Sequence, residues 1–214
     1  MNTLEFIGRE FTVNIHQFHQ PVEIPNTTRI DFALLLNNLG FNHGVEVGVE
    51  RGLYSEVLLK AIPDLHLYSI DAWTAYSGYR DHLLQSQMDK LYQEATDRLT
   101  PYKNRNYIIK AFSVDAAKQF PEEHFDFVYL DGNHAFKQVI DDIYAWYPKV
   151  KVGGILAGHD YIKRRDQRYM MDVIPAVNTF VGVMGIKPLF VLGRKAKIEG
   201  EARESVRSWF IVKQ

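Results

Sequence analysis

The stretch that decides the fold is residues 44–55, which read GVEVGVERGLYS. A short apolar run leads into two glycines, Gly48 and Gly52, and a helix-forming stretch, SEVLLKAI, begins at Ser55. Glycine allows a tight turn after a strand and a close approach of the backbone to a ligand. A helix that follows such a turn points its unpaired N–H groups at the ligand. The stretch therefore predicts a strand, a ligand-binding loop and a helix.

The rest of the chain repeats this alternation of strand and helix. Further strands are expected at 65–70, 106–111, 125–130, 154–158, 189–192 and 208–212. Helices are expected at 29–39, 79–99, 135–147 and 172–184. Strands that alternate with helices favour right-handed crossovers and a mostly parallel, doubly wound sheet. The fold class is therefore α/β, with seven strands in the sheet.

Length and composition indicate one domain. A chain of 214 residues is long enough for one α/β domain and short for two. We expect an N-terminal arm over 1–28 and the domain itself over 29–214. The net charge of −1 gives no sign of a nucleic-acid partner, and the absence of cysteine excludes thiolate metal sites. No signal peptide or membrane-spanning run is evident, so a cytoplasmic location is expected.

Polar residues follow the strands at one edge of the predicted sheet. The strands end at Gly48, at Asp71, at 112–113, at Asp131 and at 159–160. In doubly wound folds, ligands bind beyond the carboxyl ends of the strands. This edge is therefore the expected active site.

Two carboxylates sharpen the interpretation of the glycine loop. Glu46 lies within an apolar strand, where a charge is costly unless it is paired, so it either holds the loop or meets a cationic group of the ligand. Asp71 ends the next strand, where a carboxylate can accept hydrogen bonds from ribose hydroxyls; the alternative is a helix cap. The acidic pair Asp141 and Asp142, by contrast, is expected to face solvent.

Together these motifs resemble the Rossmann-like methyltransferases that use S-adenosylmethionine. The first motif of that family begins E-x-G-x-x-x-G, which Glu46, Gly48 and Gly52 match, and Ser55 follows three residues after Gly52. The resemblance continues through SIDAW (69–73), FSVD (112–115), FDFVYLDGNHAF (125–136) and GGILAGHDY (153–161). Taken together, these motifs resemble those of the macrocin-type small-molecule O-methyltransferases. The resemblance implies a single Rossmann-like domain whose C-terminal strand is antiparallel. It also implies the cofactor-binding residues Glu46, Gly48, Gly52, Ser55, Asp71, Ala72, Trp73, Ser113 and Asp131.

A second group of residues points to proton and metal chemistry. Asp131 and His134 follow one strand, and His159 and Asp160 follow the strand expected beside it. An imidazole titrates near neutral pH, so His134 is the expected general base, with Asp131 as its catalytic partner; the alternative is a helix-terminal histidine bonded to backbone. Relatives that depend on a metal imply a divalent cation, Mg²⁺ or Mn²⁺, at Asp131, His159 and Asp160. Imidazole suits magnesium poorly, and His159 could instead turn away.

The expected activity is transfer of a methyl group from S-adenosylmethionine to a hydroxyl of a small-molecule acceptor, such as a sugar or a natural-product intermediate. Two alternatives are a methyltransferase that acts on a macromolecule and a non-catalytic module that only binds the cofactor. A dinucleotide oxidoreductase is disfavoured because the spacing is G-x-x-x-G and not G-x-G-x-x-G. Neither nucleic acid nor a membrane is an expected partner, and a homo-oligomer stays open.

Overall fold

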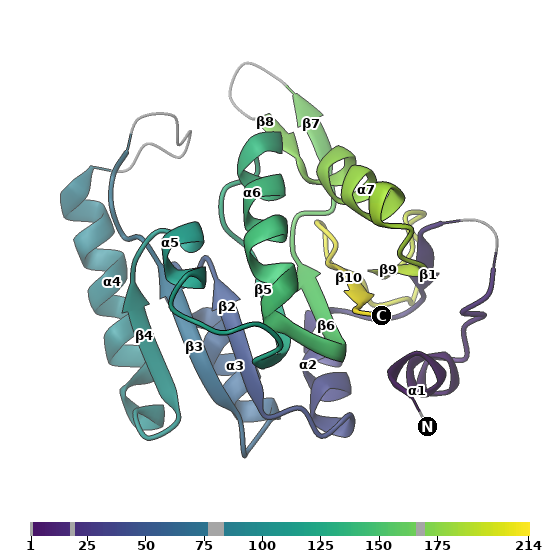
Figure 1. Ribbon diagram of the computed structural model, residues 1–214, viewed down its shortest axis with the longest axis horizontal. Helices are drawn as coiled ribbons and strands as arrows, with labels where there is room; N and C mark the ends of the chain where they lie inside the picture. The colour runs from purple at the N-terminus through teal and green to yellow at the C-terminus, as the bar shows by residue number, and fades with distance from the viewer. Residues whose placement is uncertain (1, 18–19, 77–83, 166–169) are drawn as a thin grey trace.

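The computed structural model describes residues 2–17, 20–76, 84–165 and 170–214. Within these residues the chain forms an eight-stranded sheet with helices on both faces (Figure 1). The order of its strands is β1-β9-β10-β6-β5-β2-β3-β4, and β7 and β8 form a separate two-stranded sheet. No helix in the described part of the chain is long and apolar enough to cross a membrane.

The parallel centre of the sheet consists of strands that end at the expected site. These strands are β2 (His43–Val47), β3 (His66–Asp71), β4 (Asn106–Lys110), β5 (Phe125–Leu130) and β6 (Val150–Gly158). Beyond β6 the sheet continues with β10 (Trp209–Val212), β9 (Leu189–Leu192) and β1 (Val22–Ile24). The smaller sheet pairs β7 (Lys163–Arg165) with β8 (Met170–Asp172). Strand β10 is antiparallel to both of its neighbours, as expected for the C-terminal strand.

Helices connect the strands and form two layers. They are α1 (Thr3–Glu10), α2 (Arg29–Asn38), α3 (Leu53–Ala61), α4 (Gln85–Leu99), α5 (Ser113–Ala117), α6 (Phe136–Trp146) and α7 (Val173–Met184), with short 3₁₀ turns at Thr100–Tyr102 and Tyr147–Lys149. Figure 1 shows α5, α6 and α7 on the face of the sheet toward the viewer. The helix expected over 79–99 is described from Gln85 on; its first residues, 79–83, lie outside the described part.

The seven expected strands are confirmed, but the sheet has an eighth, β1, within the segment predicted as an arm. Its three residues are too few to show a pattern in the sequence. Val22 and Ile24 are nevertheless buried, and β1 pairs in parallel with β9. The preceding helix is also anchored, because the Thr3 hydroxyl donates to the Gly153 carbonyl at 2.6 Å. The described part of 1–28 is therefore built into the sheet and its core.

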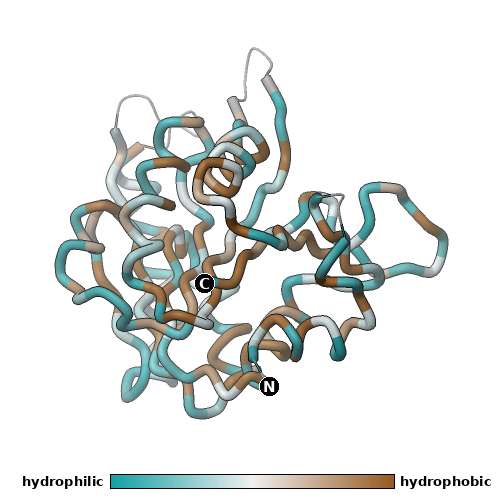
Figure 2. Tube along the Cα trace, turned by 45° about the vertical axis from the view of Figure 1, so that its right-hand side comes forward, coloured by the Kyte–Doolittle hydropathy of each residue, from teal (hydrophilic) through white to brown (hydrophobic). Residues whose placement is uncertain are grey.

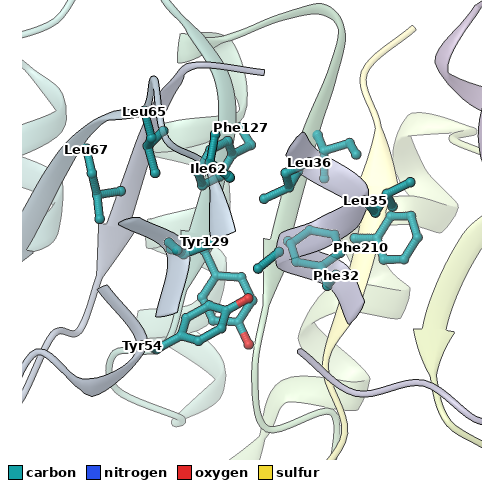
Figure 3. Close-up of a cluster of buried hydrophobic side chains, with 14 of the residues drawn as sticks. Phe32, Leu35, Leu36, Tyr54, Ile62, Leu65, Leu67, Phe127, Tyr129 and Phe210 are labelled. Carbon is teal, nitrogen blue, oxygen red and sulfur yellow. The ribbon is translucent and has the colours of Figure 1, made fainter. Parts of the chain in front are cut away.

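Each face of the sheet has its own apolar core. One core joins α2, α3 and α4 to the sheet and includes Phe32, Tyr54, Phe127, Tyr129 and Phe210 (Figure 3). The other joins α5, α6 and α7 to the opposite face, around residues such as Val128, Ile143 and Trp146. Figure 2 shows hydrophobic segments running through the centre of the molecule and hydrophilic ones in its outer loops. The two cores hold the loops at the carboxyl edge of the sheet between rigid layers.

Candidate active site

A cavity of about 650 Å³ opens at the carboxyl ends of β2, β3, β4 and β5. Its lining includes Gly48–Glu50, Asp71–Thr74, Ala111–Val114 and Asp131–His134, together with Arg29, Glu46 and Tyr54. The structure thus brings nearly all the residues expected to bind the cofactor around one space. Gly52 and Ser55 lie just behind this lining, at the start of α3.

Glu46 is the centre of a buried polar network behind the glycine loop. Its carboxyl group accepts a hydrogen bond from the Ser55 hydroxyl, which lies 3.0 Å from the hydroxyl of Ser69. The Asn106 amide donates to Ser69 at 2.7 Å. Burial raises the pKa of Glu46 to about 8, although the Ser55 hydrogen bond acts to lower it. The network ties α3 to three neighbouring strands, which agrees with the interpretation that Glu46 holds the loop and leaves the other, a contact with a cationic group of the ligand, open.

Both glycines of the loop have positive φ, but the fold itself requires them. At Gly48 (φ 89°), an added Cβ would lie 2.0 Å from the carbonyl oxygen of Asp131. At Gly52 (φ 75°), which caps α3, a Cβ would lie 3.2 Å from the side chain of Leu99. The sequence interpretation attributed these glycines to a close approach of ligand. The structure shows that Gly48 allows the loop to lie against the backbone of Asp131, and that Gly52 allows it to lie against α4.

Asp71 fixes the turn after β3. Its two carboxylate oxygens accept hydrogen bonds from the N–H of Glu50 at 2.9 Å and from the N–H of Trp73 at 3.0 Å. The buried Trp73 indole in turn donates to the Glu50 carbonyl at 2.8 Å. A carboxylate offers about four acceptor positions, so Asp71, which lines the cavity, retains capacity for ligand hydroxyls.

Asp142 was expected to face solvent, and that expectation is wrong. The side chain is buried beside the cavity, where it hydrogen-bonds to Ser113, and burial raises its pKa to about 6. The Ser113 hydroxyl also accepts from the indole of Trp146 at 2.9 Å. The signal was present in the sequence: Asp142 lies three residues after Val139 and four before Trp146, which is the spacing of one helix face. Ser113 is therefore held by α6 at the expected adenine turn.

The acid and histidine side chains after β5 and β6 converge. Nε2 of His134 lies 2.9 Å from the carboxylate of Asp160 and 3.8 Å from that of Asp131. Nδ1 of His159 lies 3.1 Å from the same oxygen of Asp160. Burial alone would lower the pKa of His134, but the two carboxylates raise it to about 10. The two imidazoles hold the pKa of Asp160 well below its usual range, against the effect of burial.

Nε2 of His134 is close to Asp160 without being hydrogen-bonded to it. Nε2 has no hydrogen-bond partner among the described residues, although the carboxylates of Asp160 and Asp131 lie 2.9 Å and 3.8 Å away. One ligand atom each from Asp131, His134 and Asp160 lies within 4.8 Å of the others. A convergent set of two carboxylates and an imidazole is suited to a divalent cation. The histidine in this set is His134, whereas the sequence interpretation had chosen His159.

Arg29 also lines the cavity, and no pattern in the sequence pointed to it. It is the first residue of α2, and its guanidinium lines the cavity. Nε lies 3.0 Å from the carboxylate of Glu204, Nη1 lies 4.0 Å from Asp131, and the group sits 5.1 Å from the ring centre of Tyr54. Glu204 is far away along the chain, so only the folded structure brings it to Arg29.

Comparison with known proteins supports a methyltransferase. The family model of the methyltransferase domain matches residues 45–161, more than half of the chain. An uncharacterized protein, R132, of Acanthamoeba polyphaga mimivirus is 36% identical over 78 residues, and the match covers 34% of each protein. This chain thus spans about a third of that relative's length.

Solved structures share the fold at low identity. A putative caffeoyl-CoA O-methyltransferase from Staphylococcus aureus superposes with a TM-score of 0.61 at 15% identity, over 98% of this chain and 90% of that one. An O-methyltransferase from Bacillus cereus in complex with SAH gives 0.59 at 14% identity, over 99% and 90%. The chain therefore belongs to the methyltransferase-domain family, and it has the Rossmann-like fold of the S-adenosylmethionine-dependent enzymes.

Proposed function

We propose that this protein transfers the methyl group of S-adenosylmethionine to a hydroxyl of a small-molecule acceptor. One observation carries the proposal: a single cavity joins the glycine loop and Asp71 to the acid–histidine group at Asp131 and His134. The names of the solved structures, two O-methyltransferases of which one contains SAH, support both the cofactor and the class of acceptor.

The lining of the cavity offers groups that would bind the parts of the cofactor in order along the edge of the sheet. Asp71 would accept from the ribose hydroxyls, while Trp73 and the turn at Ser113 would pack against and bind the adenine. The methionine end would lie over Gly48 and the first turn of α3, close to Glu46. The sulfonium methyl would then face the loop after β5, where Asp131 and His134 lie. Its position there is what a transfer to a neighbouring hydroxyl requires.

His134 is the candidate for handling the hydroxyl proton, but its surroundings restrict that role. An imidazole whose pKa is raised to about 10 is already protonated at neutral pH and cannot accept another proton. A general base at this position therefore requires that the charges of Asp131 and Asp160 be neutralised. A divalent cation would supply that neutralisation and would also lower the pKa of a hydroxyl bound beside it.

The residues present fit such a cation, with Asp131, His134 and Asp160 as its ligands. Nε2 of His134 faces both carboxylates without a hydrogen bond among the described residues, which favours this set. Nε2 cannot both bind a cation and accept the proton, so the two roles of His134 exclude each other. An imidazole ligand suits Mn²⁺ better than Mg²⁺. That His134 is a base, and that any metal is bound, are proposals, as is the preference for a small acceptor over nucleic acid.

Calorimetry with S-adenosylmethionine tests the cofactor, and a protein that does not bind it would remove the proposed function. Methyl transfer to a panel of catechols and sugars, with EDTA or with added Mn²⁺, tests the cation. His134→Gln and His159→Gln form a matched pair. Loss of Mn²⁺ binding in the first variant alone identifies His134 as a ligand. Unchanged Mn²⁺ binding with lost turnover identifies it as the base.

A further inference from the structure

We propose that Arg29 binds the carboxylate of the cofactor's methionine moiety and so selects a cofactor that carries an intact amino acid. This inference rests on the proposed use of S-adenosylmethionine and assigns a role to a residue outside the known motifs of the chain. Four features carry it: the charge of the cavity, the place of Arg29 along the sheet edge, its helix layer, and the way its side chain is held.

The cavity is acidic, and Arg29 is the one arginine or lysine among the lining residues that the structure describes, while Nε2 of His134 already faces the carboxylates of Asp131 and Asp160. The carboxylates in the same lining are those of Glu50, Asp71, Asp131, Asp141 and Asp142, whereas Glu46, whose pKa burial raises to about 8, is mostly neutral at pH 7. S-adenosylmethionine has two cationic centres, the sulfonium and the ammonium, and one anionic group, the carboxylate. An acidic cavity attracts the cationic centres and repels the carboxylate. The carboxylate therefore needs a cation, and Arg29 supplies it.

The order of the strands places Arg29 at the correct end of the cavity. Asp71 and Ser113, the ribose and adenine positions, follow β3 and β4 at one end of the sheet (Figure 1). Arg29 contacts Asp131, after β5, and Glu204, which precedes β10 on the other side of β2. A cofactor whose adenosine lies over β3 and β4 extends its methionine end toward β2 and β5. Arg29 lies at the end of the cavity where the methionine moiety would bind.

The helix layers separate Arg29 from the expected acceptor position. Arg29 begins α2, which packs with α3 in the core on one face of the sheet. His134 precedes α6, which belongs to the core on the other face. The glycine loop, over which the methionine end would lie, leads into α3 and not into α6. Arg29 thus shares its layer with the methionine end, while the acceptor side faces His134.

The side chain of Arg29 is held in place before any ligand binds. The Tyr54 hydroxyl donates to the Arg29 carbonyl at 3.0 Å, and the ring of Tyr54 lies under the guanidinium. Tyr54 itself packs on Tyr129, with 4.6 Å between ring centres (Figure 3). The carboxylate of Glu204 lies 3.0 Å from Nε of Arg29 and accepts a hydrogen bond from the backbone N–H of Arg29 at 3.2 Å. Within the described part of the chain no hydrogen bond engages the Nη groups, and the carboxylate of Asp131 is 4.0 Å from Nη1, so they can bind the carboxylate of a ligand. Because the guanidinium group of Arg29 is already held in one orientation, it loses little conformational entropy when a carboxylate binds.

The test compares three ligands on the wild type, Arg29→Met and Arg29→Lys by calorimetry. The ligands are S-adenosylmethionine, its decarboxylated form, which lacks only the carboxylate, and methylthioadenosine, which lacks the whole amino acid. We expect Arg29→Met to bind S-adenosylmethionine about 10- to 100-fold more weakly, as for a lost charge-assisted hydrogen bond. Its affinity for the other two ligands should stay within about twofold of the wild type. Arg29→Lys, which keeps the charge and loses the fork, should lie between.

Lys60→Met is the matched control, because Lys60 is an exposed cation on α3 that pairs with Glu56 and does not line the cavity. It should bind all three ligands as the wild type does. Equal losses for all three ligands in Arg29→Met would overturn the inference, since Arg29 would then act through the shape of the cavity. Unchanged S-adenosylmethionine binding in Arg29→Met would overturn it as well. A wild type that binds none of the ligands would instead remove the proposed function itself.

Discussion

Gly48 and Asp131 touch through their backbones: a Cβ on Gly48 would lie 2.0 Å from the carbonyl oxygen of Asp131 and 2.4 Å from its carbonyl carbon. The N–H of Asp131 also donates to the Val47 carbonyl at 2.7 Å. The loop after β2 and the loop after β5 are thereby locked together. This contact sets the distance between the proposed cofactor loop and the proposed catalytic group.

Gly48→Ala should therefore destabilise the fold by about 3 kcal/mol or more, because backbone must move and φ is 89°. Urea unfolding measures the change. Gly182→Ala is the control: Gly182 lies in α7, has negative φ and open space around its Cα, and should gain up to about 1 kcal/mol. A Gly48→Ala protein as stable as the wild type would show that the two loops are not in contact.

Because burial raises the pKa of Glu46, we expect the folded protein to lose stability as the pH rises. The pKa of Glu46 is about 8 in the folded protein and near 4.5 when unfolded, so the folded state binds the extra proton between these values. Stability falls through this window, by at most about 1.4 kcal/mol per pH unit for one proton. Glu46→Gln, which stays neutral, should lose that slope and be more stable than the wild type at pH 8. Urea unfolding at pH 6, 7 and 8 measures it.

Glu199→Gln on the surface serves as the reference for the loss of a carboxylate, since Glu199 is exposed. Its unfolding free energy should follow that of the wild type at each pH. Identical pH slopes for Glu46→Gln and the wild type would mean that Glu46 is ionised in the fold.

A group of imidazoles at the opposite edge of the sheet predicts a loss of stability in acid. The rings of His43 and His66 stack with 5.3 Å between centres, and His124 lies 6.2 Å from His43. Burial, together with these neighbours and Lys151, lowers the pKa of His43, although Asp126 opposes the shift. The unfolded state therefore binds more protons below about pH 6.5. The contribution of His43 is complete above that pH and declines as the pH falls.

His43→Gln should reduce the fall in melting temperature between pH 7 and pH 5.5. His16→Gln, at an exposed position, should not. The difference between each variant and the wild type isolates His43 from the other titrating groups. Parallel curves for His43→Gln and the wild type would contradict the prediction.

Asp71→Asn should weaken binding of S-adenosylmethionine by about 10-fold or more. In the wild type, the two carboxylate oxygens of Asp71 accept hydrogen bonds from the N–H groups of Glu50 and Trp73, and asparagine keeps only one of these oxygens. The substitution also removes the negative charge that would accept hydrogen bonds from the ribose hydroxyls. Calorimetry measures the affinity, and Asp64→Asn on the surface is the control. Equal affinities of Asp71→Asn and the wild type would place the ribose elsewhere.

Much of the fold and of the site was predictable because local patterns determine them. Strand and helix periods predicted seven of the eight strands of the larger sheet but neither β7 nor β8, and parallel strands necessarily bring Gly48, Asp71 and Asp131 to one edge. The strand β1 was missed because three residues carry no period. Asp142 was misjudged because its charge was given more weight than its place on the buried face of α6.

The sequence by itself determined the type of sheet, the edge that carries the site and the residues of the glycine loop, since each depends on neighbours within a few positions. Only the tertiary structure decided that both His134 and His159 approach Asp131 and Asp160, because side-chain rotamers and loop packing set the 2.9 Å and 3.1 Å distances to Asp160. It also decided that Arg29 belongs to the site. Its partner Glu204 is 175 residues away, and no local pattern encodes a contact that the closing of the whole sheet creates.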